Sequence, residues 1–500
     1  MPAALFLAEA EGGGPMSLKR SAVNVLIWLA ALTAGLAFTH LLAQTSSKKI
    51  LCFFLLLIAS AVILLLKPYL SYEQLMMPVI YLLIAATFAN NAFFSIKLGF
   101  FSLFPYRILL IAAAVWLIWE MMNSQDPIER WNRVQVKGIL AFFAFWFCYG
   151  MISLLWVKSV TDGLKYLSLL GMGMFFVFLI VMYFQKLERL LAFYYIWMVM
   201  TVFLMIIGLY NHFTLHHLPS STLYNGPQYK QHYPTSVFFN QNDFATFLSI
   251  SFFFYAAFFK NVKNSYLKIA GLVLACCSVY LIFLTGSRAS ILGVIAGLLL
   301  YAFILLPRFL KKWVLVAAVC GFAAFAVLFA GKITNVVYTL FLAPQTAHDF
   351  SEPLPSNVAR ANLLKNAGHY VLDTYGFGVG VGNVPYYLEH HAIFDTDQVV
   401  EVHNWLVEIM ANFGVIMMLG YVTMYGYLML LLYRFYKSRL TSRYKLLLEG
   451  LLAALISFLV SSISPSSMSN LYFHWVFLAL VIATVNTLRI KGTDETERFR

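Results

Sequence analysis

Long apolar runs constrain this chain more than any other feature of its sequence. Of its 500 residues, 61% are hydrophobic and only 11% are charged, and a soluble globule cannot bury that much apolar surface. A run of about 20 apolar residues crosses the ~30 Å hydrocarbon core of a bilayer as a helix, because a helix satisfies its own backbone hydrogen bonds there. The sequence therefore predicts an all-α polytopic membrane protein.

About fourteen such runs are visible, and we expect about 12–14 transmembrane helices. The expected helices begin near residues 21, 50, 73, 105, 139, 164, 190, 240, 267, 289, 313, 403, 446 and 470. The first four runs fit the charge pattern worst, so a re-entrant pair among residues 21–130 stays open as an alternative.

Lysine and arginine predict the orientation, since cytoplasmic loops collect them. We expect the basic clusters on the cytoplasmic side. They lie at 130–137, 186–189, 260–268, 308–312 and 434–445 and in the C-terminal tail. We therefore expect both termini to be cytoplasmic. The net charge of +13 is explained by this topology and by anionic lipids of the inner leaflet, so nucleic acid is not an expected partner.

The chain divides into five expected segments. These are a cytoplasmic tail at 1–20, a transmembrane bundle at 21–331, a large, partly helical external loop at 332–402, the last transmembrane helices at 403–487 and a cytoplasmic tail at 488–500. Residues 1–15 are typical of a tag or of a start assigned upstream of Met16. All five cysteines lie in apolar runs, so no disulfide framework is expected.

Three polar stretches are expected on the outer face: residues 211–243, TGSRAS at 285–290, and the 332–402 loop. Arg288 in the second stretch is a cation at membrane depth, where ionisable groups are functional by default. Its guanidinium would offer paired donors to a pyrophosphate. Ser287 would orient it or ease the turn. An interfacial arginine whose head reaches water is the alternative.

In the external loop, Ser356 precedes the segment VARANLLKNAGHYVL, whose apolar residues recur at helical spacing. We expect an amphipathic helix over 357–372 that lies on the bundle, with Ser356 as its N-cap. Arg360 would point toward the membrane as a second phosphate-binding cation. A solvated arginine on a loop helix is the alternative.

The loop closes on EVHNWLVEIMANFG, which begins a membrane helix. His403 would lie at the membrane boundary, where a histidine that titrates near neutral pH can remove a proton from a sugar hydroxyl. Asn404 and Glu408 share one helix face and would hold each other or a substrate. A purely structural histidine is the alternative.

Two other chemistries are weaker interpretations of the loop. The segment GFGVGVGN has Val381 where a dinucleotide-binding fingerprint needs glycine, so we expect its glycines to allow close approach of the backbone to a ligand or a neighbouring helix. The histidines and acids of the 332–402 loop show no zinc-type spacing, so no metal is expected. The acids are Asp349, Glu352, Asp373, Glu389, Asp395, Asp397 and Glu401.

At these motifs the chain resembles the O-antigen ligase and polymerase superfamily of bacterial envelope glycosyltransferases, which includes polymerases of the teichuronic acid type. The resemblance covers roughly 230–420 and is carried, in the order of the family, by FFNQNDFATFL at 238–248, TGSRAS, GFGVGVGN and HNWLVEIMANFG at 403–414.

The resemblance implies transfer of a glycan from an undecaprenyl-pyrophosphate carrier to an acceptor glycan or lipid, at the outer face of the bacterial cytoplasmic membrane and without a cofactor. It implies that Arg288 binds the pyrophosphate and that His403 is the base. Lys230 stands where the family commonly has a basic residue before the asparagine-rich helix, in which Asn242 and Asp243 are supporting residues. The resemblance also implies membrane lipids as partners and a functional link to a polysaccharide flippase.

Three alternatives remain at this stage. A ligase and a polymerase differ in the acceptor that they use, and the sequence does not show which acceptor this protein uses. A transporter for a small anion or a lipid-linked sugar is the alternative from another class, although transporters tend to place polar groups near the membrane midplane. A glycosyltransferase that uses sugar phosphates of the dolichol type would need an acidic pair in its first external loop, and QTSSKK at 44–49 has none.

Overall fold

The computed structural model describes residues 71–93, 95–98, 101–338, 354–438, 441–465, 467 and 472–497. The chain separates into two compact units, residues 1–79 with 96–103 and residues 80–95 with 104–500. In the first unit, β1 (Ile96–Leu98) pairs antiparallel with β2 (Phe101–Leu103). Helix α4 (Tyr72–Ala89) begins in the first unit and ends in the second.

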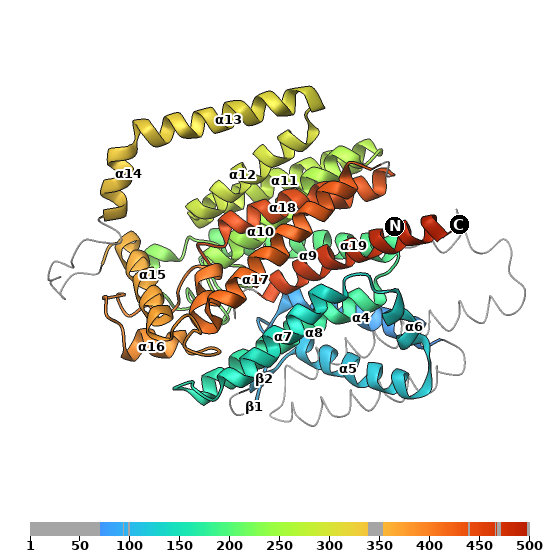
Figure 1. Cartoon of the computed structure of the whole chain (residues 1–500), viewed down its shortest axis with the longest axis horizontal. Coiled ribbons are helices and arrows are strands. Elements are labelled where there is room, and N and C mark those ends of the chain that lie inside the picture. Colours follow the sequence, from blue (N-terminus) through green and yellow to red (C-terminus); the bar gives the residue numbers. More distant parts are fainter. Residues whose placement is uncertain are drawn as a thin grey trace, which may run out of the picture. The chain divides into compact units, whose positions relative to one another are not determined.

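The rest of the second unit is helical in its described part (Figure 1). Its elements are α5 (Pro105–Asn123), α6 (Asp126–Arg133), α7 (Lys137–Ser153), α8 (Val160–Tyr183), α9 (Leu187–Thr214), the short 3-10 helix η1 (Gln228–Lys230), α10 (Gln241–Asn261), α11 (Ser265–Thr285), α12 (Arg288–Leu305), α13 (Arg308–Leu328), α14 (Ala330–Val337), α15 (Ser356–Asp373), α16 (Val384–His390), α17 (Trp405–Tyr436), α18 (Ser442–Ser461) and α19 (Tyr472–Glu497).

The prediction of an all-α polytopic membrane protein is confirmed. In the described part of the chain, 11 helices are long and apolar enough to cross a membrane, or up to 12 if α6 and α7, which are bent by 105°, form one broken span. Twelve of the predicted starts coincide with these helices to within a few residues. The two starts near residues 21 and 50 lie outside the described residues.

The predicted external loop contains more helix than the sequence suggested. Residues 332–337 belong to α14, and the later part of the loop contains α15 and α16. The prediction of Ser356 as an N-cap is wrong, because α15 begins at Ser356 and Pro355 holds the cap position. The fixed φ of proline lets the helix start directly after it. The acids Asp349 and Glu352 lie outside the described residues.

Close helix packing in the second unit depends on small residues. Helices α10, α12 and α18 pack against one another, and α19 packs along α8. A Cβ atom on Gly297 of α12 would lie 2.3 Å from Cζ of Phe253 and 2.9 Å from the backbone oxygen of Ala453. Glycine therefore allows the three helices to approach closely, as is common where lipid gives no hydrophobic force between helices.

A buried carboxylate joins the same helices one turn earlier in α18. Glu449 is fully buried and accepts hydrogen bonds from Nζ of Lys260 at 2.5 Å, from Nδ2 of Asn261 at 2.8 Å and from the hydroxyl of Tyr301 at 3.0 Å. A carboxylate at this depth is tolerated because a cation and neutral donors satisfy it.

Replacement of Gly297 by alanine tests the packing. Gly297→Ala should lower the midpoint of thermal unfolding in detergent by several degrees, since overpacking a dense interface costs about 1–3 kcal/mol. Gly321→Ala in α13 is the matched control, because nothing lies within 4 Å of a Cβ atom there. Equal midpoints for the two variants would show that the α10–α12–α18 contact is looser than the structure indicates.

Candidate active site

Helices α15 and α16 lie on the start of α17 and are held there by an apolar cluster. The buried members are Leu363, Ala367, Tyr370, Val371, Val379, Val384, Leu388, Val402 and Ala411. Helix α15 thus buries one apolar face on the bundle, as its spacing predicted. Val402 directly precedes His403, so the cluster also sets the position of the histidine.

The backbone at the start of α17 fixes His403. Its φ of 54° is left-handed, an uncommon conformation for a residue with a side chain, and the next residue, Asn404, is extended. The Asn404 side chain caps α17 by accepting a hydrogen bond from the backbone N–H of Val407 at 3.1 Å. The N–H of Trp405 donates to the carbonyl of Ser462 at 3.2 Å, which ties this turn to the end of α18.

The imidazole of His403 is oriented by a carbonyl. Its Nδ1 lies 3.2 Å from the backbone oxygen of Pro465. A carbonyl oxygen only accepts, so the neutral ring carries its proton on Nδ1 and leaves the Nε2 lone pair as an acceptor. This tautomer is the one that a general base needs.

The structure brings Arg360 and His403 together. Burial lowers the pKa of His403, the positive charge of Arg360 lowers it further, and the carbonyls of Pro465 and Ser464 oppose both effects. Arg360 is itself half-buried in α15, and this burial lowers its pKa below the ordinary value. Within the described ranges, Arg360 forms no ion pair or hydrogen bond. A cation that is partly removed from water without a counterion is suited to bind an anion.

Glu408 and Asn404 have separate partners, although they share a helix face. The buried carboxylate of Glu408 accepts hydrogen bonds from the hydroxyl of Tyr166 at 3.0 Å and from Oγ of Ser467 at 2.8 Å. Glu408 therefore joins α17 to α8 and to the segment after α18. Tyr166 is a partner that sequence reasoning missed, because it lies more than 200 residues away in an apolar helix.

The glycine-rich segment approaches a neighbouring helix at a kink. Gly414 interrupts α17 with a φ of 86°, and a Cβ atom on Gly378 would lie 2.7 Å from the Gly414 nitrogen. The N–H of Val379 donates to the carbonyl of Ala411 at 2.9 Å, and the N–H of Val415 donates to the carbonyl of Gly376 at 3.0 Å. The expected close approach of backbone is thus made to a helix.

Two asparagines hold this crossing and were also missed. Oδ1 of Asn412 in α17 accepts from the N–H of Asn383 at 3.1 Å, and Oδ1 of Asn383 accepts from the N–H groups of Lys158 and Ser159 at 2.8 Å each. Both asparagines are fully buried. An asparagine within an otherwise apolar helix was the available signal, since a buried amide must be hydrogen-bonded.

Arg288 begins α12 after a tight turn. Helix α11 ends at Thr285, and Gly286 has a left-handed φ of 69°. Oγ of Ser287 lies 3.1 Å from Oγ of Ser290, and both serines are buried, so Ser287 holds the turn. The Arg288 side chain is exposed and has no hydrogen bond or ion pair in the part of the chain that the structure describes.

Arg288 lies at the same end of the bundle as His403, although no direct contact joins them among the described residues. A Cβ atom on Gly293, about 7.5 Å further along α12, would lie 3.1 Å from Cβ of Ser461 at the end of α18. The next residue after that end, Ser462, accepts the hydrogen bond from Trp405. The first turns of α12 and α17 therefore meet the last turn of α18.

The loop after α9 covers the turn before Arg288. A Cβ atom on Gly286 would lie 3.4 Å from the ring of Tyr233. Lys230 in η1 is exposed, with Nζ 5.5 Å from the ring centre of Tyr229. The cap of α10 is Asn240, whose Oδ1 accepts from the N–H groups of Asn242 at 2.8 Å and Asp243 at 3.0 Å. Sequence reasoning named the two donors and missed the cap.

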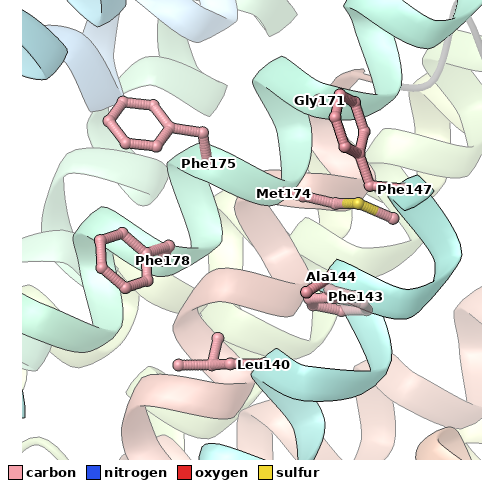
Figure 2. Close-up of a pocket in the computed structure, with 8 residues that line it drawn as sticks. All are labelled: Leu140, Phe143, Ala144, Phe147, Gly171, Met174, Phe175 and Phe178. Atoms are coloured by element: carbon pink, nitrogen blue, oxygen red, sulfur yellow. The ribbon is translucent and has the colours of Figure 1, made fainter. Parts of the chain in front are cut away.

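The apolar pocket in Figure 2 lies elsewhere and contains no group for acid–base or phosphate chemistry. It has a volume of about 240 Å³ and is lined by residues of α7 and α8, namely Leu140, Phe143, Ala144, Phe147, Gly171, Met174, Phe175 and Phe178. Among the described residues, histidine, cysteine and acidic side chains form no group of three that could hold a metal ion. The candidate site is therefore the convergence of Arg360, His403 and Arg288 at one end of the bundle.

Comparison with known proteins identifies the family. Residues 270–422 match the O-antigen ligase family, a stretch that contains Arg288, Arg360 and His403 but not Lys230, Asn242 or Asp243. The teichuronic acid biosynthesis protein TuaE of Bacillus subtilis (strain 168) is 62% identical over 480 residues, which cover 95% of this chain and 98% of that protein. The chain belongs to the O-antigen ligase family and is a multi-pass membrane enzyme of the glycosyltransferase type that acts in polysaccharide biosynthesis.

Proposed function

We propose that this enzyme moves a glycan from an undecaprenyl-pyrophosphate carrier to the hydroxyl of an acceptor glycan, at the outer face of the cytoplasmic membrane. The observation that carries the proposal is the half-buried guanidinium of Arg360, which has no counterion among the described residues and is near enough for its charge to lower the pKa of His403, a histidine oriented as a base. A pyrophosphate would supply the missing negative charge. The family match supports the lipid-linked substrate.

The arginines would stabilise the leaving group. Breaking the bond between the anomeric carbon and the pyrophosphate builds negative charge on the carrier, and fixed cations in a site with little water stabilise that charge without reorganisation. Arg360 would bind the phosphates from α15, and Arg288 would bind them from the start of α12. The exposed Lys230 would add charge from the loop that covers the Arg288 turn.

His403 would act as the general base. Its Nε2 would take the proton of the acceptor hydroxyl while the hydroxyl oxygen attacks the anomeric carbon. The bond to the pyrophosphate then breaks, and its electron pair leaves with the carrier. This single displacement inverts the anomeric configuration. Asn404 would position His403 through the helix cap, Glu408 would do so through its bonds to Tyr166 and Ser467, and Ser287 would position Arg288 through the turn.

We further propose that the product is a polymer of the teichuronic acid type and that the acceptor is a growing carrier-linked chain. The support is the high identity to a Bacillus subtilis protein named for teichuronic acid biosynthesis. The distribution of basic residues supports cytoplasmic termini and an external site. Repeat units assembled in the cytoplasm would then need a flippase before they reach this enzyme.

Substitution of the two central residues tests the assignment of roles. His403→Ala should lower the rate of glycan transfer by about 10²–10⁴-fold, which is the usual contribution of a positioned base. Arg288→Ala should lower transfer strongly, and Arg288→Lys should restore only part of it because lysine lacks the paired donors. The measurement is transfer in vitro by purified protein with a synthetic lipid-pyrophosphate donor.

Controls for these variants come from the same region. His391→Ala removes an exposed histidine of the loop, and Lys365→Ala removes a cation of α15 that lies over the Phe394 ring. Both controls should transfer at nearly the normal rate. Full transfer activity in both Arg288→Ala and His403→Ala would contradict the proposed mechanism.

The pH profile tests the coupling between Arg360 and His403. A base must be neutral, so activity falls as the pH drops through the pKa of His403, and burial with the nearby cation moves that fall below the range of an ordinary histidine. Arg360→Gln removes the cation, raises the pKa of His403 and should move the acidic limb of the kcat profile to higher pH. Arg360→Lys should leave the limb near its original position.

The KM values separate the two proposed roles of Arg360. Loss of phosphate binding should raise KM for the donor in Arg360→Gln at every pH, whereas loss of coupling changes only the position of the limb. If the acidic limb of the kcat profile stays in place in Arg360→Gln, the proposed electrostatic coupling between Arg360 and His403 is wrong, even if KM for the donor rises.

Product length decides the acceptor class. With donor units alone, a polymerase should make a ladder of carrier-linked chains that differ by one repeat. The measurement is gel or mass analysis of the products. A single product, formed only after an unrelated lipid or glycan anchor is added, would indicate a ligase and overturn the polymerase proposal while leaving the site chemistry intact.

A further inference from the structure

A patch of exposed apolar side chains lies beside the candidate site and has no role in the proposed chemistry. Leu372 at the end of α15 is 73% exposed, and in the chain between α15 and α16 Tyr375 is 92% exposed and Phe377 is 56% exposed. After α7, Leu155 is 86% exposed and Trp156 is 37% exposed. Side chains of this size and number are costly to leave in water.

Hydrogen bonds join the two halves of the patch into one surface. The Tyr149 hydroxyl donates to the carbonyl of Phe377 at 2.7 Å, and Nε1 of Trp156 donates to the carbonyl of Gly378 at 3.2 Å. The N–H of Val381 also donates to Oγ of Ser153 at 3.0 Å. The tip of the loop is therefore fixed to the end of a membrane helix. Figure 1 shows α15 and α16 at the same end of the second unit as the end of α7.

The patch continues onto exposed apolar side chains of α7. On α7 itself, Phe145 is 55% exposed and Ile152 is 56% exposed, and on a helix of a membrane protein such residues contact acyl chains. Tryptophan and tyrosine gather where acyl chains meet headgroups, as they do here at the helix end. The exposed Lys158 beside them suits lipid phosphates.

We propose that the surface formed by Leu155, Trp156, Leu372, Tyr375 and Phe377 inserts into the headgroup region of the bilayer and anchors the external loop. The partner is phospholipid, because the patch is apolar, is edged by the cation Lys158 and is continuous with exposed apolar side chains of α7, which would contact acyl chains. The inference depends on the membrane fold and not on the proposed chemistry.

The anchor would set the depth of the active site. Leu372 stands at the C-terminal end of α15, and Arg360 stands in the same rigid helix about 18 Å earlier along its axis. Holding one end of α15 in the headgroup region keeps Arg360 and His403 at a constant distance from the membrane surface. A lipid tail would hold the phosphates of a substrate at the same depth in the membrane. The phosphates would therefore already be level with Arg360 and His403.

Site-directed fluorescence in liposomes tests the anchor. The full chain is made without its five cysteines, and single cysteines are introduced as Tyr375→Cys or Leu372→Cys and labelled with bimane. The control is Gln398→Cys, because Gln398 is exposed in the same loop and its φ of 59° matches the 53° of Tyr375. The quenchers are a phosphatidylcholine with a nitroxide near the top of its acyl chain, and aqueous iodide.

We expect the lipid nitroxide to quench the label at residues 372 and 375 several-fold more than at 398, and iodide to show the reverse order. Strong iodide quenching at 372 and 375 with little lipid quenching would overturn the anchor, since the patch would then face water. Protection from both quenchers would overturn it as well, because the patch would pack against protein such as a second copy. Both test residues are exposed, so their replacement opens no cavity.

Discussion

The crossing of the glycine-rich segment over the kink in α17 is the constraint on which the site depends. At this point two backbones approach so closely that a Cβ atom on Gly378 would meet the Gly414 nitrogen at 2.7 Å, and hydrogen bonds join the chain on both sides of the kink. The crossing attaches the external segment to the helix that begins with Trp405. Helix α15 is therefore held over the start of α17, where the charge of Arg360 acts on His403.

The electrostatics of the two ends of α18 differ. Near its beginning, the buried Glu449 is satisfied by Lys260 and by neutral donors, which is a stabilising arrangement. Beyond its end, the half-buried Arg360 has no counterion within the described residues, and its charge depresses the pKa of His403. An uncompensated cation is unfavourable for folding and favourable for binding a phosphate. Such local costs are typical of active sites.

Much of the candidate site could be proposed from the sequence, because the proposed chemistry requires particular residue types in exposed or boundary positions. Arg288, Arg360 and His403 each interrupt an apolar pattern, and an ionisable group at a membrane boundary has few structural explanations. The residues that support them were not readable in the same way. Tyr166, Asn383 and Asn412 are buried in helices or at a crossing, and their partners come from segments far away in the chain. The misplaced cap at Ser356 was a local error, caused by neglect of the proline before it.

The sequence by itself determined the class of protein and the membrane-length helices of the described part, and it indicated three charged or titratable residues that suit phosphate and proton chemistry. Hydrophobic length and the cost of burying charge are local properties, so they can be read along the chain. Only the tertiary structure decided which of these residues meet. The charge of Arg360 acts on His403, Arg288 lies at the same end of the bundle through α18, and Glu408 turns to Tyr166 instead of Asn404. Those pairings depend on backbone crossings and helix packing between distant segments, which no periodicity in a single segment records.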